Sequence, residues 1–182
     1  MIVTPRILVR IAAIGLLGVL IQLSFFSRVE LLHVSPDVLP ALVACMGLLG
    51  GTMTGAVSGF AIGFFVDCLL VEALGITSLV LLGVGYLAGL FRERFEIHSS
   101  LVPPLLCMGL TLLAELGFGA AQLLLGIDAP VSILIVRDML LKSVYAFFLG
   151  WPIYLGVRRV LRPALVEEPK VRRRRQPTVL GA

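Results

Sequence analysis

Six separate apolar runs constrain the fold of this chain more than any other feature of its sequence. A bilayer core about 30 Å thick is crossed by roughly 20 apolar residues in a helix. Hydrophobic residues make up 59% of the 182 positions, and the mean hydropathy of +1.06 is far above what a soluble domain of this length needs for its core. We therefore expect an all-α integral membrane protein, a bundle of six transmembrane helices. The predicted spans cover residues 7–27, 38–49, 52–71, 76–91, 101–125 and 133–157.

Two of these runs, residues 38–49 and 76–91, are shorter than a full span. We expect both helices to be tilted, broken or partly buried in protein, because an exposed short helix would leave backbone polar groups in lipid. Pro40 lies in the first turn of the shorter run, where its missing N–H costs little. This proline is therefore compatible with a helix start.

The basic residues fall mostly on one side of the predicted membrane. Twelve of the fifteen Lys and Arg residues flank span ends that would face the same compartment. Because cytoplasmic loops retain Lys and Arg, both termini are expected in the cytoplasm, which also requires an even number of spans. A signal peptide is the other interpretation of the first run, but no small-x-small cleavage pattern follows it, so we interpret it as a retained helix.

The predicted membrane domain covers residues 1–162, and residues 163–182 form a tail. The tail has low hydrophobicity, three prolines and the basic run Arg172–Arg175, a composition typical of disorder. Two roles are open for it: setting the topology, or contacting anionic lipid headgroups at about 1 kcal/mol per basic residue near the surface. No nucleic-acid partner is expected, because no aromatic residues are interleaved with the arginines.

Four glycines recur every four residues in the third run: Gly51, Gly55, Gly59 and Gly63. On a helix they form one face without side chains, which we call the glycine stripe. Such a stripe lets another helix backbone approach closely, and this is a common way for membrane helices to associate. We expect a close helix contact here, either inside this protein or with a partner.

Asp67 continues the spacing of the glycine stripe and so lies on nearly the same helix face. It is expected to face protein, because a carboxylate in hydrocarbon costs at least about 2.5 to 3.5 kcal/mol. Glu115 and Lys142 lie at similar depths in the fifth and sixth spans, about 21 to 22 Å from the cytoplasmic ends. The three side chains are thus predicted to share one layer of the bundle.

These residues and two neighbours predict an intramembrane charge cluster. Its members are Asp67, Glu115, Arg137, Asp138 and Lys142. Within it, Asp67 is expected to pair with Lys142, with Arg137 or with a neighbouring backbone. Two functions are open: a proton or ion relay, or a structural pairing that fixes the helix register.

The sequence shows no pattern typical of catalysis or metal binding. The three cysteines occur singly within apolar runs, and the predicted topology puts His33 and His98 on opposite sides of the membrane. Nucleophile–base pairs, phosphate-binding loops and metal-ligand spacings are not found. We therefore expect a protein that is not an enzyme and holds no metal or cofactor.

Three consecutive segments resemble the MreD family, the rod shape-determining membrane proteins of bacteria. They read SPDVLPALVACMGLLGG, GAVSGFAIGFFVDCLL and EALGITSLVLLGVGYLAGLFRERF. The resemblance is most specific over residues 36–96 and elsewhere follows length and topology only, and the basic tail extends past the family pattern. The matching positions are Pro36, Pro40, Gly55, Gly59, Phe60, Gly63, Asp67, Leu74, Gly75, Gly85 and Tyr86.

The resemblance implies a fold similar to the substrate-binding subunits of energy-coupling-factor vitamin transporters. It also implies a non-enzymatic component of the cell-wall elongation machinery in the bacterial inner membrane. Such a protein would bind an MreC-like single-span partner and help to regulate peptidoglycan synthesis and rod shape. A glycan polymerase and a penicillin-binding transpeptidase of the same machinery are further candidate partners. The glycine stripe or an outward-facing groove would hold the partner helix.

The alternative function is the capture of a vitamin for an energy-coupling-factor transporter. Those subunits are similar to one another in an A-x-x-x-A pattern on the first helix, where the coupling subunit docks. Here Ala12 and Ala13 are followed four positions later by Leu16 and Leu17. Trp151, the single tryptophan, lies low in the sixth span, where it could not stack on a vitamin ring. Both observations favour the cell-shape function.

Overall fold

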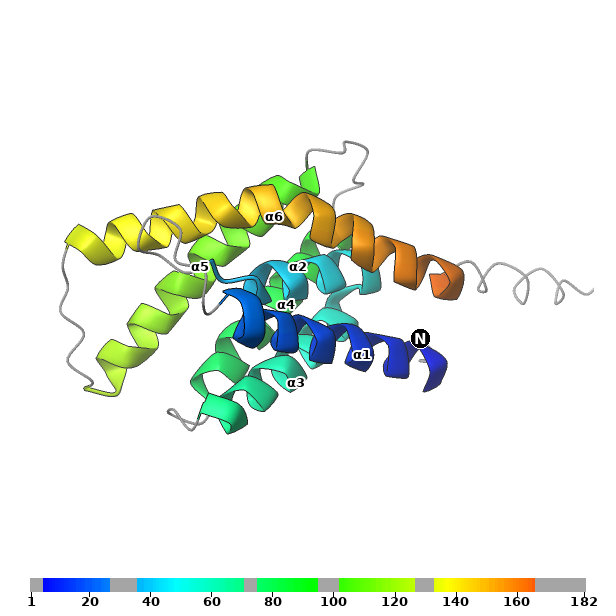
Figure 1. Cartoon of the computed structure of the whole chain (residues 1–182), viewed down its shortest axis with the longest axis horizontal. Coiled ribbons are helices and arrows are strands. Elements are labelled where there is room, and N and C mark those ends of the chain that lie inside the picture. Colours follow the sequence, from blue (N-terminus) through cyan, green and yellow to red (C-terminus); the bar gives the residue numbers. More distant parts are fainter. Residues whose placement is uncertain (1–4, 27–35, 71–74, 95–101, 127–132, 166–182) are drawn as a thin grey trace, which may run out of the picture.

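The computed structural model describes residues 5–26, 36–70, 75–94, 102–126 and 133–165. Within these ranges all regular secondary structure is helical (Figure 1). The elements are α1 (Pro5–Ile21), the π-helical turn η1 (Gln22–Phe26), α2 (Leu39–Gly50), α3 (Thr52–Leu70), α4 (Ile76–Arg94), α5 (Val102–Leu124) and α6 (Ile133–Leu165). The expected all-α architecture with six helices is therefore confirmed.

The helix ends follow the apolar runs closely, except at the end of α6 and at the end of α1, where the π-helical turn η1 replaces the last residues of the predicted helix. From α2 to α5, each end lies within three residues of the predicted one. By contrast, α6 continues to Leu165 and so includes the first residues of the predicted tail, while residues 166–182 lie outside the described residues. In this part of the chain α3, α4, α5 and α6 are long and apolar enough to cross a membrane, and α1 and α2 contain shorter apolar segments.

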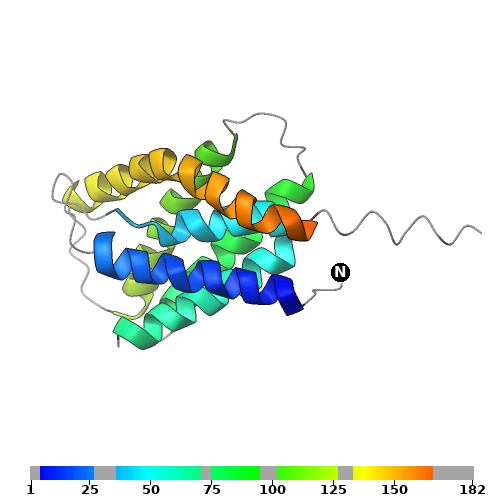
Figure 2. The same cartoon turned by 45° about the vertical axis from the view of Figure 1, so that its right-hand side comes forward.

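The short helix α2 forms the centre of the bundle. Every residue from Leu39 to Leu49 is buried, and α3, α4, α5 and α6 all pack against it (Figures 1 and 2). Twelve residues extend only about 18 Å, which is too short to cross a bilayer core of about 30 Å. A helix that is apolar on all sides is typical of a buried core element. The second apolar run is thus short because it is enclosed by protein.

Small side chains allow α5 and α6 to approach this central helix. The Sγ atoms of Cys45 on α2 and Cys107 on α5 lie 3.6 Å apart, and both thiols are free and buried. Gly150 on α6 packs at the same place, where an added Cβ would lie 3.0 Å from the Cys107 Cβ. The two cysteines therefore act as small packing residues, although the sequence did not indicate that they meet.

The turn between α2 and α3 is bound to the end of α4. The Arg92 guanidinium donates a hydrogen bond to the Leu49 carbonyl, and the Thr52 N–H donates one to the Glu93 carboxylate at 3.1 Å. The start of α1 and the end of α6 also lie toward one side of the molecule (Figures 1 and 2). The first feature agrees with antiparallel α3 and α4, and the second with an even number of passes of the chain through the bundle.

Candidate functional site

The glycine stripe packs against α4 of the same chain. A Cβ added at Gly55 would overlap the Gly85 carbonyl oxygen, and one added at Gly59 would overlap the Leu81 carbonyl oxygen. At Gly63 the added Cβ would lie 2.5 Å from the Ser78 Cα. The two backbones are thus in direct contact over three turns. Of the two expected locations for this contact, the structure shows the one inside the protein.

Gly51 has a separate role at the start of the stripe. Its φ of 90° lies in the left-handed region that favours glycine, and its N–H donates to the Gly47 carbonyl at 2.8 Å, which ends α2. Gly89 on α4 packs here, since a Cβ added at Gly89 would lie 2.6 Å from the Gly51 carbonyl carbon. The stripe therefore continues the α3–α4 contact as far as the α2–α3 turn.

Asp67 binds the start of α4. One carboxylate oxygen, Oδ2, accepts hydrogen bonds from the Gly75 N–H at 3.0 Å, the Ser78 N–H at 3.2 Å and the Ser78 hydroxyl at 2.8 Å. The first N–H groups of a helix have no acceptor within that helix. Here the Asp67 carboxylate, which belongs to α3, is the acceptor for N–H groups at the start of α4. Asp67 is only 2% exposed, and these hydrogen bonds offset the free-energy cost of burying its carboxylate. Its partner is thus a neighbouring backbone, one of the three partners expected.

We expect Asp67→Ala to lower the free energy of unfolding by about 1 to 3 kcal/mol, because two N–H groups and a hydroxyl lose their acceptor. Asp67→Asn retains one acceptor oxygen and should therefore lower the free energy of unfolding by less. Thermal unfolding of the purified protein in one detergent would measure both. Combining Asp67→Ala with Ser78→Ala should cost less than the sum of the single changes, and full additivity would contradict this bonding pattern.

Glu115 on α5 and Lys142 on α6 form an ion pair. The Lys142 Nζ lies 3.0 Å from Oε1 and 3.1 Å from Oε2 of Glu115. The Glu115 side chain is 11% exposed and that of Lys142 is 28% exposed, so the pair is largely enclosed. The structure therefore brings together two members of the predicted cluster. It places Asp67 elsewhere, and Lys142 bonds to Glu115 rather than to Asp67.

Arg137 and Asp138 lie on α6, about one turn before Lys142. The Arg137 side chain is exposed, while that of Asp138 is half-buried. The predicted five-residue cluster is thus divided among an α4 cap, an α5–α6 ion pair and two residues nearer the start of α6. Depth along each helix was similar, but helix rotation separates Asp67 from the pair.

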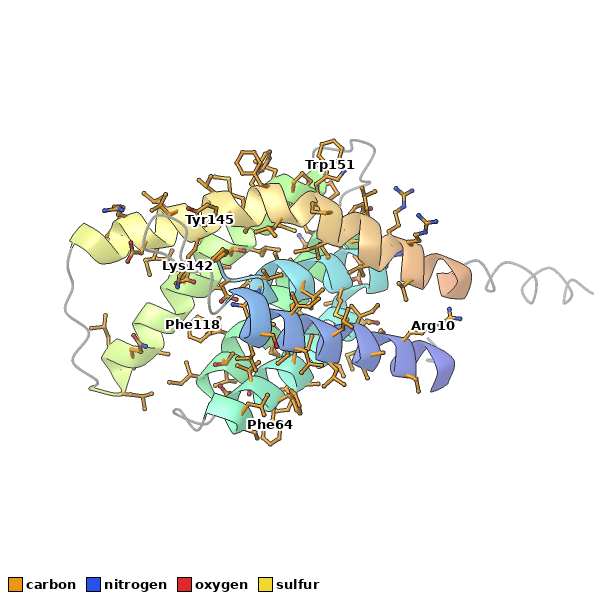
Figure 3. The ribbon with its side chains drawn as sticks, in the orientation of Figure 1. Arg10, Phe64, Phe118, Lys142, Tyr145 and Trp151 are labelled. Carbon is orange, nitrogen blue, oxygen red and sulfur yellow. The ribbon has the colours of Figure 1, made fainter. Side chains whose placement is uncertain are left out.

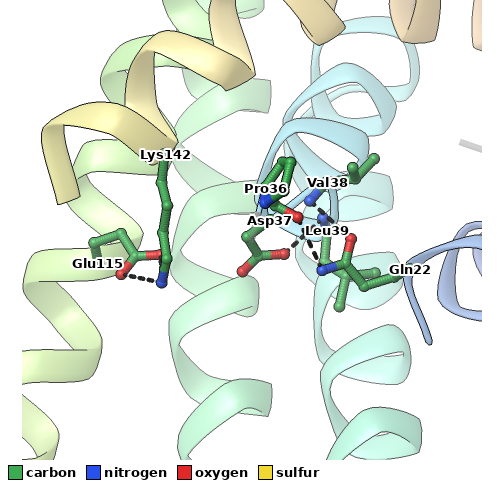
Figure 4. A network of polar contacts seen from close by, with 7 residues as sticks. All are labelled: Gln22, Pro36, Asp37, Val38, Leu39, Glu115 and Lys142. Atoms are coloured by element: carbon green, nitrogen blue, oxygen red, sulfur yellow. Dashed lines mark hydrogen bonds and ion pairs between the residues drawn. The ribbon is translucent and has the colours of Figure 1, made fainter. Parts of the chain in front are cut away.

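Two residues outside the predicted charge cluster complete this region. Asp37 precedes α2, accepts the Leu39 N–H through Oδ1 at 3.1 Å, and lies within electrostatic range of Glu115 and Lys142 (Figure 4). Gln22 at the start of η1 donates to the Pro36 carbonyl at 3.2 Å and accepts the Val38 N–H at 3.0 Å. Gln22 is a polar residue within the first apolar run. It is the one sequence signal that could have indicated a polar contact at this end of the bundle.

We call Gln22, Asp37, Glu115 and Lys142 the polar cluster. It joins the end of α1, the start of α2, and the middle of α5 and α6 (Figure 4). One ammonium group lies near two carboxylates, so the arrangement holds these elements by charge and hydrogen bonding. In the described ranges no group of three or more His, Cys, Asp or Glu residues is placed to bind a metal ion.

A second surface feature is an apolar groove between α1 and α3, with a volume of about 290 Å³. We call it the α1–α3 groove. On another face of α3, the rings of Phe60 and Phe64 stack with centroids 6.2 Å apart, and Figure 3 shows Phe64 pointing away from the bundle. The residues that line the groove are Ile11, Ala12, Gly15, Leu16, Val19, Ser58, Ala61, Ile62 and Phe65.

Comparison with known proteins identifies the family. A family model described as rod shape-determining protein MreD matches residues 6–160, which covers most of the chain and all six helices. No curated protein and no solved structure gives a significant match. The similarity to transporter subunits therefore stays a prediction, and the vitamin-transport alternative gains no support. With this match and its bundle of apolar helices, the chain belongs to the MreD family and is a membrane protein with a role in rod shape determination.

Proposed function

We propose that this protein binds an MreC-like single-span membrane protein in the bacterial inner membrane. By holding that partner it helps to regulate peptidoglycan synthesis by the elongation machinery. The glycan polymerase and the penicillin-binding transpeptidase of that machinery are candidate further partners. The family match supports the cell-shape context, and the exposed helix faces support a function in binding.

The observation that carries the proposal is the α1–α3 groove. The glycine stripe is already filled by α4, so a partner helix needs another surface with small residues. The groove has such residues on both of its helices, including Ala12 on α1, and Ser58 and Ala61 on α3. In lipid, helices associate where small residues permit close van der Waals packing. A single apolar helix with a ridge of larger side chains fits this groove.

Three exposed aromatic residues lie on α3, and one of them, Phe65, lines the groove. Phe60, Phe64 and Phe65 are 46%, 53% and 40% exposed, and the first two stack on each other. Aromatic side chains bury large areas on contact and lose little conformational freedom. A helix in the groove would therefore gain contact area from Phe65, the one of these three residues that lines the groove.

The proposed orientation has both termini in the cytoplasm. Its support is the positive-inside distribution of Lys and Arg, together with the position of the α1 start and α6 end on one side of the fold (Figure 2). The basic run Arg172–Arg175 would then contact anionic headgroups of the inner leaflet. This run lies outside the described residues, so the proposal rests on its charge alone.

The proposed role needs no chemistry from the polar cluster. Of the two functions considered for the buried charges, we favour the structural one, because Asp37, Glu115 and Lys142 each have a hydrogen-bond partner within the fold. In this role the cluster fixes the position of α1 and η1 relative to α2 through Gln22. The cluster thereby holds one wall of the groove in place.

Ala12→Trp is expected to reduce recovery of a tagged MreC-like partner at least tenfold. Ala12 is exposed and lines the groove, so the indole would occupy the space of the partner helix without disturbing the core. The measurement is co-purification of the two full-length proteins from membranes. In cells that depend on this chain, the same variant should give rounded cells.

The matched control is Ala13→Trp, at the next position on α1. Ala13 is also exposed but does not line the groove, so this variant should retain the partner and the rod shape. Equal loss of partner recovery with both variants would indicate a general effect on α1. Full partner recovery with Ala12→Trp would place the partner on another surface.

A further inference from the structure

A second groove, which the proposed partner contact does not use, lies between α4 and α5. It has a volume of about 460 Å³, within the range of about 300 to 1,000 Å³ that is typical of small-molecule sites. Its lining is apolar apart from one arginine. The residues that matter for its shape are Leu87, Leu90 and Arg94 on α4, and Leu105, Leu106 and Gly109 on α5.

Arg94 is the one charged residue of this α4–α5 groove, and it is the last residue of α4. Its side chain is exposed and makes no hydrogen bond or ion pair with any residue that the structure describes. Arg92, two positions earlier, instead donates to the Leu49 carbonyl. The two arginines therefore differ: Arg92 stabilises the fold, and Arg94 lies at the mouth of an apolar groove without a partner among the described residues.

The position of Arg94 along the helix defines the chemistry of a ligand. α4 is an apolar span that ends at this arginine, so the guanidinium lies where the hydrocarbon core gives way to the headgroup region. A ligand for the groove thus needs a long apolar part beside Leu87 and Leu106 and an anionic group at one end. Guanidinium groups bind phosphate through two parallel hydrogen bonds.

We propose that the α4–α5 groove binds an anionic phospholipid. One acyl chain lies between α4 and α5, and the phosphate contacts the Arg94 guanidinium. A partner helix is a poorer fit, because it would place apolar side chains against the charged mouth. This site is separate from the basic tail, since its residues belong to the ends of α4 and α5.

The test uses fluorescence quenching by brominated lipids in vesicles. Leu105→Trp in a Trp151→Phe background places the single indole of the chain at the groove. We expect brominated phosphatidylglycerol to occupy the site about fivefold more strongly than brominated phosphatidylcholine, which corresponds to about 1 kcal/mol for one basic residue. In this background Arg94→Gln should abolish the preference, while Arg94→Lys should keep part of it, because lysine supplies the charge but not the paired hydrogen bonds.

Two charge controls separate this site from general attraction. Arg159→Gln removes an exposed arginine of α6 that does not line the groove, and it should leave the preference unchanged. Replacement of Arg172–Arg175 by glutamine should also leave it unchanged. Equal quenching by both lipids would overturn the proposal. Loss of the preference in either control variant, with the preference retained in Arg94→Gln, would also overturn it.

A shape control tests the apolar part of the groove. An added Cβ at Gly109 meets nothing within 4 Å, so Gly109→Leu can place a side chain at the groove without a backbone clash. It should lower quenching by brominated phosphatidylglycerol severalfold. Gly83→Leu makes the same change at a glycine of α4 that is equally open and lies outside the groove, and it should have no effect. Unchanged quenching with Gly109→Leu would show that the lipid is not held between α4 and α5.

Discussion

Gly59→Ala is expected to destabilise the protein by more than about 3 kcal/mol and to reduce the yield of folded protein sharply. The added methyl group would overlap the Leu81 carbonyl oxygen of α4. This neighbour is backbone and cannot rotate away as a side chain could, so α3 and α4 would have to separate. Overpacking of this kind costs about 1 to 3 kcal/mol where side chains can adjust, and more where they cannot.

The matched control is Gly83→Ala on α4. A Cβ at Gly83 meets nothing within 4 Å, so the same chemical change should leave stability within about 0.5 kcal/mol of the wild type. The measurement is thermal unfolding in detergent, together with the monodisperse fraction on size exclusion. A Gly59→Ala protein as stable as the Gly83→Ala protein would contradict the close α3–α4 contact. Loss of partner binding in stripe variants would follow from misfolding.

Lys142→Met is the other change with a large expected effect, a loss of about 3 kcal/mol. It leaves Glu115 without its cation in a site where that carboxylate is 11% exposed. Removal of one partner from a buried pair typically costs about 3 to 5 kcal/mol, and the 28% exposure of Lys142 favours the lower end. Adding Glu115→Gln should recover at least about 1 kcal/mol, because no charge then remains unpaired.

Asp67 supplies the control for this double-mutant cycle. Asp67→Ala and Lys142→Met should add, because Asp67 bonds to Gly75 and Ser78 at the start of α4. Coupling between Asp67 and Lys142 above about 0.5 kcal/mol would contradict the structure. Strict additivity of Glu115→Gln and Lys142→Met would also contradict the structure. All variants are compared by unfolding in the same detergent.

The sequence was sufficient to predict the number, type and approximate ends of the helices. Apolar runs are long, and Gly and Pro interrupt them at positions such as Gly51 and Pro40, so the boundaries of α2 and α3 are well marked. The stripe also predicted a close helix contact, because four-residue spacing fixes one helix face. It did not predict that α4 is the partner, since spacing on one helix carries no information about the helix opposite.

The arrangement of the polar residues was harder to predict, for a physical reason. Rise along a helix predicts depth, and it predicted similar depths for Asp67, Glu115 and Lys142, but their contacts depend on rotation and on helix order in the bundle. Asp37 was missed because it follows Pro36 in a segment that resembles an outer loop. It lies near Glu115 and Lys142 because the short α2 begins inside the bundle, beside α5 and α6.

The shortness of α2 also has a consequence for how the chain is made. Its surface is covered by α3, α4, α5 and α6, which all leave the ribosome after it, and Gly150 on the last helix completes the covering. The central helix therefore cannot reach its final surroundings until synthesis is nearly complete. The packing around α2 is thus completed only after α6 has been made, so the core of the bundle closes around a helix that is made early.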